Sequence, residues 1–144
     1  MRLTKHTDFA LRVLLFLAVR QGERIATQSI ADAYDISTNH LQKVVRALGE
    51  LELVHLHRGV HGGVELARDP KEVSIGAVMR ALDDERGLVE CFRPETDACV
   101  VSPACHLKGA LWNAQEAFYA SLDSVTLADC VRRRAQELRK LTGS

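Results

Sequence analysis

The chain has 144 residues, of which 47% are hydrophobic and 26% charged, and its formal net charge is zero. This is the composition of a globular protein with one ordinary domain, or a small domain with an appendage, that can bury a core without disulfide staples. The charge is segregated, however: residues 83–97 hold six acids and two arginines, whereas residues 132–140 hold five bases and one acid. We therefore expect separate charged surfaces, of which only one needs to meet DNA.

The N-terminal segment is apolar but is not typical of a signal peptide. Asp8 and Arg12 interrupt its apolar run, and no small-residue cleavage site follows. No stretch reaches the roughly 18 apolar residues that a membrane span needs. We therefore expect a cytoplasmic protein with no membrane partner. In that compartment cysteines stay reduced, and a group of them indicates metal or redox chemistry more often than disulfides.

Three helices are predicted in the first third of the chain. The first spans about residues 4–20 and ends at Gly22, because its apolar residues recur at a spacing near 3.6. A short helix over residues 28–35 follows, with Thr27 as its N-cap, and Ser37 is the predicted N-cap of a third helix. The apolar face of the third helix consists of Leu41, Val44, Val45, Leu48 and Leu51. Two short helices joined by a tight turn are typical of a helix-turn-helix.

A β-hairpin is predicted directly after these helices. Its strands cover residues 53–57 and 64–67, and its glycine-rich tip covers residues 58–63. A helix, a helix-turn-helix and a hairpin in this order predict a winged helix. The glycines of the tip permit close approach to a phosphate or a groove, and Arg58 suits a narrow minor groove. A solvated turn is the alternative, but the preceding helix-turn-helix favours DNA.

The predicted DNA-contacting residues lie on the third helix and on the tip of the hairpin. Those expected to reach bases or phosphates are Thr38, Asn39 and His40. Those expected to bind phosphates are Lys43 and Arg46. Those expected to enter the adjacent minor groove are Arg58 and His61. The expected partner is double-stranded operator DNA.

Further helices are predicted beyond the hairpin. Ser74 caps a helix over residues 75–82, and a long helix runs from Cys105 to about residue 122. One side of the long helix is lined by Leu107, Leu111, Ala114, Phe118 and Leu122. This is more apolar surface than so small a domain covers by itself, so we interpret it as a dimer helix. Thr126 and Asp129 form a cap for a last helix that runs to about residue 141.

Three of the four cysteines lie within fifteen residues, at Cys91, Cys99 and Cys105. Their spacing lacks the CxxC pair that zinc sites favour, and the longer gaps suit an iron–sulfur cluster. Cys130 lies in a helical pattern, where we expect a buried cysteine that acts as a small hydrophobe. Three thiolates leave one iron position open. The local candidates for a fourth ligand are His106, Glu90, Glu95 and Asp97.

With these elements in this order, nearly the whole chain resembles the iron–sulfur winged-helix repressors, which include NsrR-type and IscR-type regulators. The stretches that carry the resemblance are MRLTKHTDFALR, STNHLQKVVRALGELELVHLHRGVHGG and CHLKGALWNAQEAFYASLDSVTLADCV. The expected fold is mainly α with a small β-hairpin wing. We expect a winged helix-turn-helix domain over residues 1–83, a cluster-binding loop over residues 84–106, and a dimerisation helix with a C-terminal helix over residues 107–144.

The resemblance is stronger to the NsrR type. IscR-type members use a histidine three residues after the last cysteine, and this chain has Lys108 there. NsrR-type members use an N-terminal aspartate of the other subunit, which Asp8 matches. The resemblance therefore implies that Asp8 of the partner subunit joins the three cysteines around a cluster, with 4Fe-4S favoured and 2Fe-2S possible. A carboxylate is a hard ligand that holds such iron weakly, so its iron would be the labile corner.

The function implied by the resemblance is that of a homodimeric transcription repressor, not an enzyme, that releases its operator when nitric oxide nitrosylates the cluster. An iron-sensing or redox-sensing regulator of the same fold is one alternative. An electron-transfer or thiol-redox protein, in which the winged helix binds a protein, is another. The sequence has no phosphate-binding loop and no evident Ser/His/Asp order, which argues against an enzyme.

Overall fold

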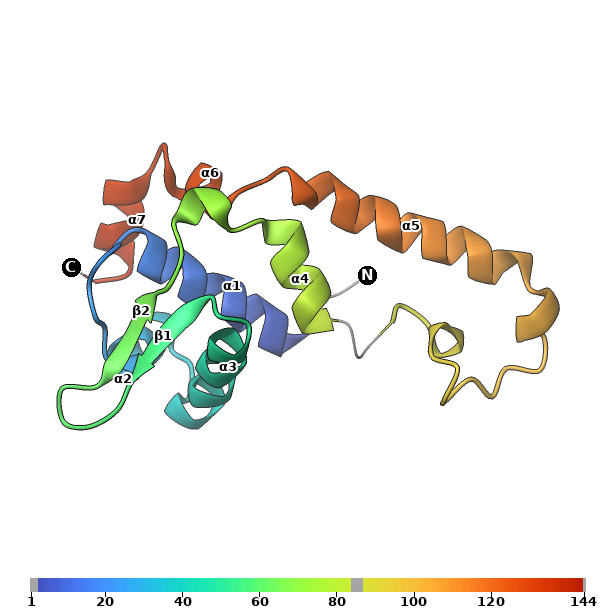
Figure 1. The fold of residues 1–144 in the computed structure, drawn as a ribbon, viewed down its shortest axis with the longest axis horizontal. Helices are drawn as coiled ribbons and strands as arrows, with labels where there is room; N and C mark the ends of the chain where they lie inside the picture. Colours follow the sequence, from blue (N-terminus) through green and yellow to red (C-terminus); the bar gives the residue numbers. More distant parts are fainter. Residues whose placement is uncertain (1–2, 84–86, 144) are drawn as a thin grey trace.

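The computed structural model describes residues 3–83 and 87–143 (Figure 1). The N-terminal half consists of α1 (Lys5–Ala18), α2 (Thr27–Tyr34), α3 (Thr38–Glu50), β1 (Val54–His57) and β2 (Gly63–Leu66). It is followed by the 3-10 helix η1 (Pro70–Glu72), α4 (Ile75–Asp83), η2 (Glu90–Phe92) and η3 (Ser102–Ala104). The chain ends with α5 (His106–Asp123), α6 (Leu127–Val131) and α7 (Ala135–Leu141). The predicted fold class, mainly α with a small hairpin wing, is confirmed.

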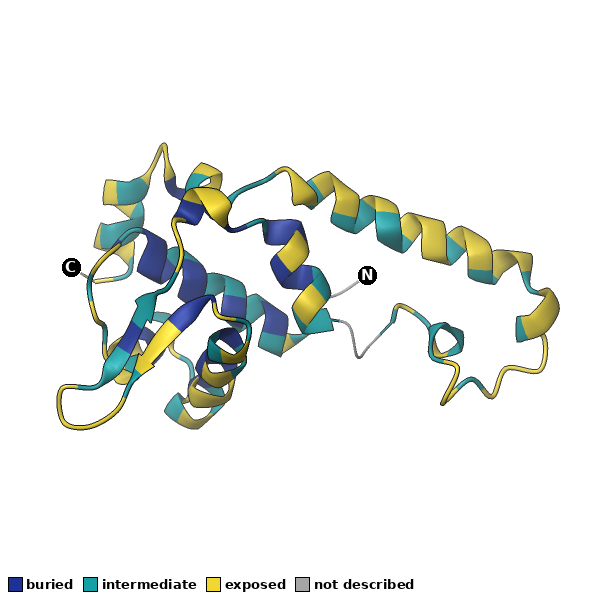
Figure 2. Cartoon of the chain, in the orientation of Figure 1, coloured by how far each residue is buried: buried dark blue, intermediate teal, exposed yellow. Residues whose placement is uncertain are grey.

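The molecule consists of a rounded body and an arm (Figure 1). The body holds α1 to α4, the hairpin, α6 and α7, whereas α5 and the loop over residues 87–105 form the arm. Figure 2 shows that the buried residues are confined to the body, and no residue of α5 is buried. The predicted domain bounds at residues 1, 84 and 144 lie outside the described residues. None of the helices in the described ranges combines the length and the apolar character that crossing a membrane requires.

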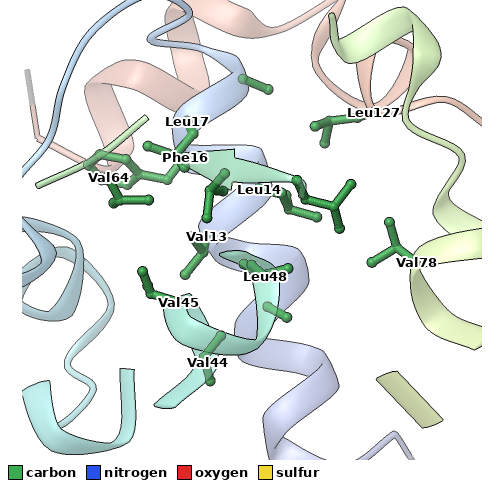
Figure 3. Close-up of a cluster of buried hydrophobic side chains, with 14 of the residues drawn as sticks. Val13, Leu14, Phe16, Leu17, Val44, Val45, Leu48, Val64, Val78 and Leu127 are labelled. Atoms are coloured by element: carbon green, nitrogen blue, oxygen red, sulfur yellow. The ribbon is translucent and has the colours of Figure 1, made fainter. Parts of the chain in front are cut away.

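The core is built around α1, whose apolar side chains contact four other elements (Figure 3). The labelled residues come from α1 (Val13, Leu14, Phe16, Leu17), α3 (Val44, Val45, Leu48), β2 (Val64), α4 (Val78) and α6 (Leu127). All of them are at most 4% exposed. Full burial of such a side chain contributes roughly 1.5–3 kcal/mol. The spacing of apolar residues in α1 and α3 therefore fixes the position of the helix-turn-helix on the body.

Of the N-caps predicted from the sequence, all but one are present. The Ser37 Oγ accepts a hydrogen bond from the His40 amide (3.3 Å) and so caps α3, as predicted. The Ser74 Oγ accepts one from the Ala77 amide (3.2 Å) at the start of α4, also as predicted. The predicted cap at Thr27 is wrong, because Thr27 is the first residue of α2. Its N-cap is Ala26, which has no side chain that can accept a hydrogen bond.

Two predictions for the C-terminal segment are also wrong. A single last helix was expected, but the chain leaves helical geometry at Arg134 (φ −136°, ψ 26°), which separates α6 from α7. The capping box of Thr126 and Asp129 is present at the start of α6, as expected. Cys130 is exposed, not buried. Leu127 and Val131 lie one turn apart on the side of this short helix that faces the core. Cys130 lies next to that side.

A buried arginine holds the C-terminus on the body. The Arg20 guanidinium lies 3.9 Å from the centre of the Phe16 ring and donates hydrogen bonds to the Arg139 carbonyl (3.2 Å) and the Gly143 carbonyl. Burial, with a contribution from Arg139, lowers the pKa of Arg20. Arg139 in turn donates to a Glu23 carboxylate oxygen at 2.7 Å. The end of α7 is thereby attached to the end of α1.

The Ser37 cap generates a prediction for stability. Replacing the cap in Ser37→Ala removes the acceptor for the His40 amide, and loss of such a cap costs about 1 kcal/mol. We expect a lower free energy of unfolding with an unchanged slope in urea denaturation. Ser29→Ala is the matched control, since Ser29 is an exposed serine inside α2, where alanine is the better helix former. Equal stability of the Ser37→Ala variant and the native chain would contradict the prediction.

Candidate DNA-binding face and cysteine-rich loop

The outer face of α3 carries those predicted DNA-contacting residues that belong to this helix. They differ in how far they are exposed. Asn39, Lys43 and Arg46 are exposed, and their spacing places them along one side of the helix. Thr38 and His40 are only partly exposed, because each contacts another helix. The Thr38 Oγ1 donates to the Gln28 Oε1 (2.7 Å). The first three residues of the helix are therefore not equally free to reach DNA.

The ring of His40 packs against the first helix. It meets the ring of Phe9 edge to face, with a centroid distance of 5.0 Å and an interplanar angle of 71°. Phe9 lies in the second turn of α1, one residue after Asp8. This contact connects the start of α3, the expected recognition helix, to the start of α1.

The wing is a tight hairpin with an exposed tip. Gly59 adopts φ +94°, a conformation that favours glycine, and its carbonyl accepts the Gly62 amide (2.9 Å). A Cβ on Gly62 would lie 2.5 Å from the His57 carbonyl oxygen, so the turn excludes a larger residue there. Arg58 and His61 are exposed at this tip. The structure thus brings both of the predicted wing residues to one surface.

Sequence reasoning missed two exposed residues on these surfaces. Gln42 lies on α3 three residues after Asn39 and four before Arg46, which places it on the same side of the helix, and a glutamine amide can read an adenine edge. Val60 is 99% exposed at the tip of the wing, between Arg58 and His61. The helical spacing could have identified Gln42. An exposed valine in a turn carried no signal.

The first turn of α1 places Asp8 in an ion pair. Its carboxylate accepts from the Arg12 Nε (3.2 Å) and Nη2 (2.7 Å), and the two side chains are 41% and 42% exposed. The Arg12 guanidinium also lies 5.9 Å from the centre of the Tyr34 ring, whose hydroxyl donates to the Arg12 carbonyl (3.2 Å). Burial raises the pKa of Tyr34. Asp8 therefore has a partner within its own chain, and its role as a cluster ligand stays a prediction.

Thr7, one residue earlier, connects α1 to the base of the arm. It is fully buried, and its Oγ1 donates to the Asp83 Oδ1 at 2.6 Å. Asp83 is the last residue of α4, and its other oxygen accepts from the Tyr119 hydroxyl of α5 (3.4 Å). Burial and the nearby Asp83 carboxylate raise the pKa of Tyr119. One carboxylate thus joins three helices just before the cysteine-rich segment.

The three predicted cluster cysteines lie in the arm as free thiols. Cys91 is in η2, Cys99 is exposed in the loop, and Cys105 immediately precedes α5. Within residues 3–83 and 87–143, no three His, Cys, Asp or Glu side chains come close enough together to hold a metal ion. The donor chemistry nevertheless suits an iron–sulfur cluster, because three accessible cysteines share one loop. Figure 1 shows this loop in the arm, apart from α1, which carries Asp8.

The local candidates for a fourth ligand differ in how they are held. Glu90, Glu95 and His106 are exposed, whereas the Asp97 carboxylate is only 15% exposed. The Asp97 Oδ2 accepts from the Ser102 hydroxyl (2.5 Å). This hydrogen bond, with those from the Cys99 amide and the Lys108 ammonium, holds the pKa of Asp97 below its usual value against the opposing effect of desolvation. Asp97 is therefore committed to contacts within the loop.

Comparison with known proteins gives consistent results for family and fold. The model of the Rrf2 family, described as iron-dependent transcriptional regulator, matches residues 3–133. The chain is 45% identical over 142 residues to the HTH-type transcriptional regulator NsrR of Bacillus subtilis, covering 98% of this chain and 97% of that protein. It is 42% identical over 133 residues to the HTH-type transcriptional repressor NsrR of Streptomyces coelicolor, covering 91% and 88%.

Solved structures show the same arrangement of elements. The chain is similar to CymR, the global cysteine regulator of B. subtilis, with a TM-score of 0.71 and 26% identity over 92% of this chain and 97% of that one. It also resembles IscR of T. potens, with a TM-score of 0.69 and 22% identity over 92% and 87%. The second likeness concerns the fold alone.

The exposed bases of α3 generate a prediction for DNA affinity. Lys43→Ala and Arg46→Ala should each weaken binding to a random-sequence duplex and lower the slope of log K against log salt by about 0.9, since each would release one phosphate contact. Fluorescence anisotropy at several salt concentrations measures this slope. Lys140→Ala is the control, because Lys140 is an exposed base on α7, across the body from α3 (Figure 1). Unchanged slopes for both α3 variants would exclude these residues from the interface.

Proposed function

This chain belongs to the Rrf2 family of transcriptional regulators, and on that premise we propose that it is a homodimeric repressor that senses nitric oxide through an iron–sulfur cluster. The similarity to NsrR regulators along nearly the whole chain carries this proposal. The cluster, the nitric-oxide signal and the dimer are what we propose. The proposal builds on a transcriptional regulator with a winged helix.

The proposed ligands are Cys91, Cys99 and Cys105 of one subunit and Asp8 of the other. They would hold a 4Fe-4S cluster, or a 2Fe-2S cluster with fewer irons. When bound, the cluster supplies a centre that reacts with nitric oxide, most readily at the iron with the carboxylate ligand. The position of α1 in the body and of the cysteines in the arm supports ligation between subunits (Figure 1).

The ion pair with Arg12 leaves Asp8 available for this role. Both side chains are about two-fifths exposed and lie one helical turn apart, and exposed pairs with this spacing contribute about 0.3–0.5 kcal/mol. Moving the Asp8 carboxylate away from Arg12 therefore costs little. Arg12 in turn offers Asp8 a defined position whenever it is not a ligand. The first turn of α1 can thus have two arrangements.

Contacts of the residues on either side of Asp8 connect it to the DNA-binding face. Phe9 follows Asp8 in the chain and packs against His40 at the start of α3. Thr7 precedes Asp8 and bonds to Asp83 at the base of the arm. A displacement of this part of α1 would therefore disturb its contacts with the recognition helix and with the base of the arm. This is how the residues of the chain would couple ligation of Asp8 to the affinity for operator DNA.

The second subunit is proposed to cover the arm. The arm carries several exposed apolar residues: Val100, Val101, Leu107 and Trp112. Leu107 is 63% exposed, although it opens the apolar side of an 18-residue helix. Large apolar side chains left exposed in one part of a protein are typical of an interaction surface. A second copy is the partner that also brings Asp8 to the cysteines.

The switch is tested with anaerobically reconstituted protein on a duplex that the protein selects from a random-sequence pool. We expect the cluster-loaded protein to protect a pseudo-palindromic segment in a footprint, and stoichiometric nitric oxide to remove the protection. Equal protection by the cluster-free protein would overturn the switch. The family description names iron dependence, so an iron sensor is the second candidate. It predicts protection that follows cluster occupancy and ignores nitric oxide at constant occupancy.

Asp8→Ala supplies the variant for the same experiment. We expect a cluster with an altered visible spectrum and faster loss to a chelator, because one iron lacks its carboxylate ligand. Glu72→Ala, which removes an exposed carboxylate of η1, should behave as the native protein. A native spectrum and a native nitric-oxide response for Asp8→Ala would remove Asp8 from the ligand set.

The dimer generates a separate prediction. Leu107→Glu and Leu111→Glu each place a charge on the apolar side of α5, and burying an unpaired charge strongly disfavours association. We expect a shift from dimer to monomer in sedimentation velocity at micromolar concentration, with an unchanged far-UV spectrum. Asn113→Glu adds the same charge at an exposed position of α5 away from this side and should leave the dimer intact. A monomeric native protein would refute the interface.

A further inference from the structure

We infer that Asp97 is a positioning residue, not a ligand: it preforms the segment between Cys99 and Cys105, and Lys108 anchors it to α5. The inference rests on the proposed function only in taking these two cysteines as ligands. Its basis is a closed set of side-chain hydrogen bonds within the arm.

The Asp97 carboxylate is bonded on both oxygens. Its Oδ1 accepts from the Cys99 amide at 3.1 Å. Its Oδ2 accepts from the Ser102 hydroxyl at 2.5 Å and from the Lys108 Nζ at 3.4 Å. The Lys108 Nζ also donates to the Ser102 Oγ at 2.9 Å, which closes a triangle of three side chains. The positions on either side of Asp97, residues 94–96 and 98–100, are all exposed.

The backbone inside this triangle is folded into consecutive turns. The Ser102 amide donates to the Cys99 carbonyl (3.1 Å), and the Cys105 amide donates to the Ser102 carbonyl (3.4 Å). Cys99 and Cys105 thus each share a backbone hydrogen bond with Ser102, whose side chain Asp97 and Lys108 hold. The two side chains fix the position of Ser102, and the turns on either side of it fix the positions of the two cysteines.

Lys108 connects this folded segment to a rigid element. It lies in the first turn of α5, three residues after Cys105, on the side of the helix that returns toward the cysteine. A ligand from that position would have to displace the contacts with Asp97 and Ser102. In this chain the position is occupied by a cation that binds the loop. Preorganising ligands in this way lowers the entropy that cluster binding has to overcome.

The first test uses cluster-free protein, so it does not depend on the sensor chemistry. Asp97→Asn keeps the shape of the side chain but weakens the bonds to Lys108 and Ser102. We expect hydrogen exchange in peptides over residues 97–106 to accelerate at least about tenfold, the lower end of the range for loss of one hydrogen bond to a charged group. Alkylation of Cys99 and Cys105 should accelerate likewise, with Cys91 as the internal reference. Glu95→Gln, at an exposed carboxylate of the same loop, should change neither rate.

The second test uses the reconstituted protein. Asp97→Asn, Ser102→Ala and Lys108→Met should lose the cluster to a chelator several-fold faster than the native protein, with an unchanged visible spectrum. Exchange rates of cluster-free Asp97→Asn equal to those of Glu95→Gln would overturn the inference. So would an altered cluster spectrum in Asp97→Asn, which would make Asp97 a ligand. A native chain that takes up no cluster would instead refute the proposed function, and the exchange measurement would still decide the role of Asp97.

Discussion

The hydrogen bond from the buried Thr7 hydroxyl to Asp83 orients the first turn of α1. It is short (2.6 Å), and it joins the first turn of the central helix to the point where the chain leaves the body for the arm. Successive residues of a helix point about 100° apart. With Thr7 directed at Asp83, Asp8 is directed at Arg12 and Phe9 at His40. Three neighbouring residues thus contact three different partners: the base of the arm, Arg12 and the recognition helix.

The arm itself depends on a close approach between α4 and α5. A Cβ on Gly76 would lie 2.2 Å from the Asp123 Oδ1 and 2.8 Å from the Tyr119 carbonyl oxygen, so only glycine lets the two helices meet there. Arg80, one turn further along α4, binds Glu116 and Asp123 at 2.8 and 3.1 Å. These contacts fix the C-terminal half of α5 to the body. The N-terminal half, with the cysteines, extends beyond it (Figure 1), which is suitable for a segment that a second subunit covers.

Apart from the cap of α2, features with a local cause could be predicted from the sequence, and those with a distant cause could not. The Ser37 cap, the apolar stripe of α3 and the hairpin depend on a few neighbouring residues, and they were identified. The break at Arg134 follows no glycine or proline; it lets α7 turn back to the buried Arg20. The partners of His40 and Asp97 likewise come from other elements. Sequence patterns identified the candidate residues, but not which of them form contacts with other parts of the chain.

The sizes of these contacts suit a switch. The Asp8–Arg12 pair is exposed and contributes under about 1 kcal/mol, an edge-to-face aromatic contact such as that of Phe9 and His40 about 0.5–1.5 kcal/mol, and a hydrogen bond to a charged group such as Asp83 about 1.5–3 kcal/mol. Rearranging one or two of them supplies the roughly 1–3 kcal/mol that couples two sites by a factor of about 5 to 150. A domain of this size is stable by about 5–15 kcal/mol. In the proposed switch, the first turn of α1 would therefore change partners and alter DNA affinity while the core around Leu14 and Leu48 stays folded.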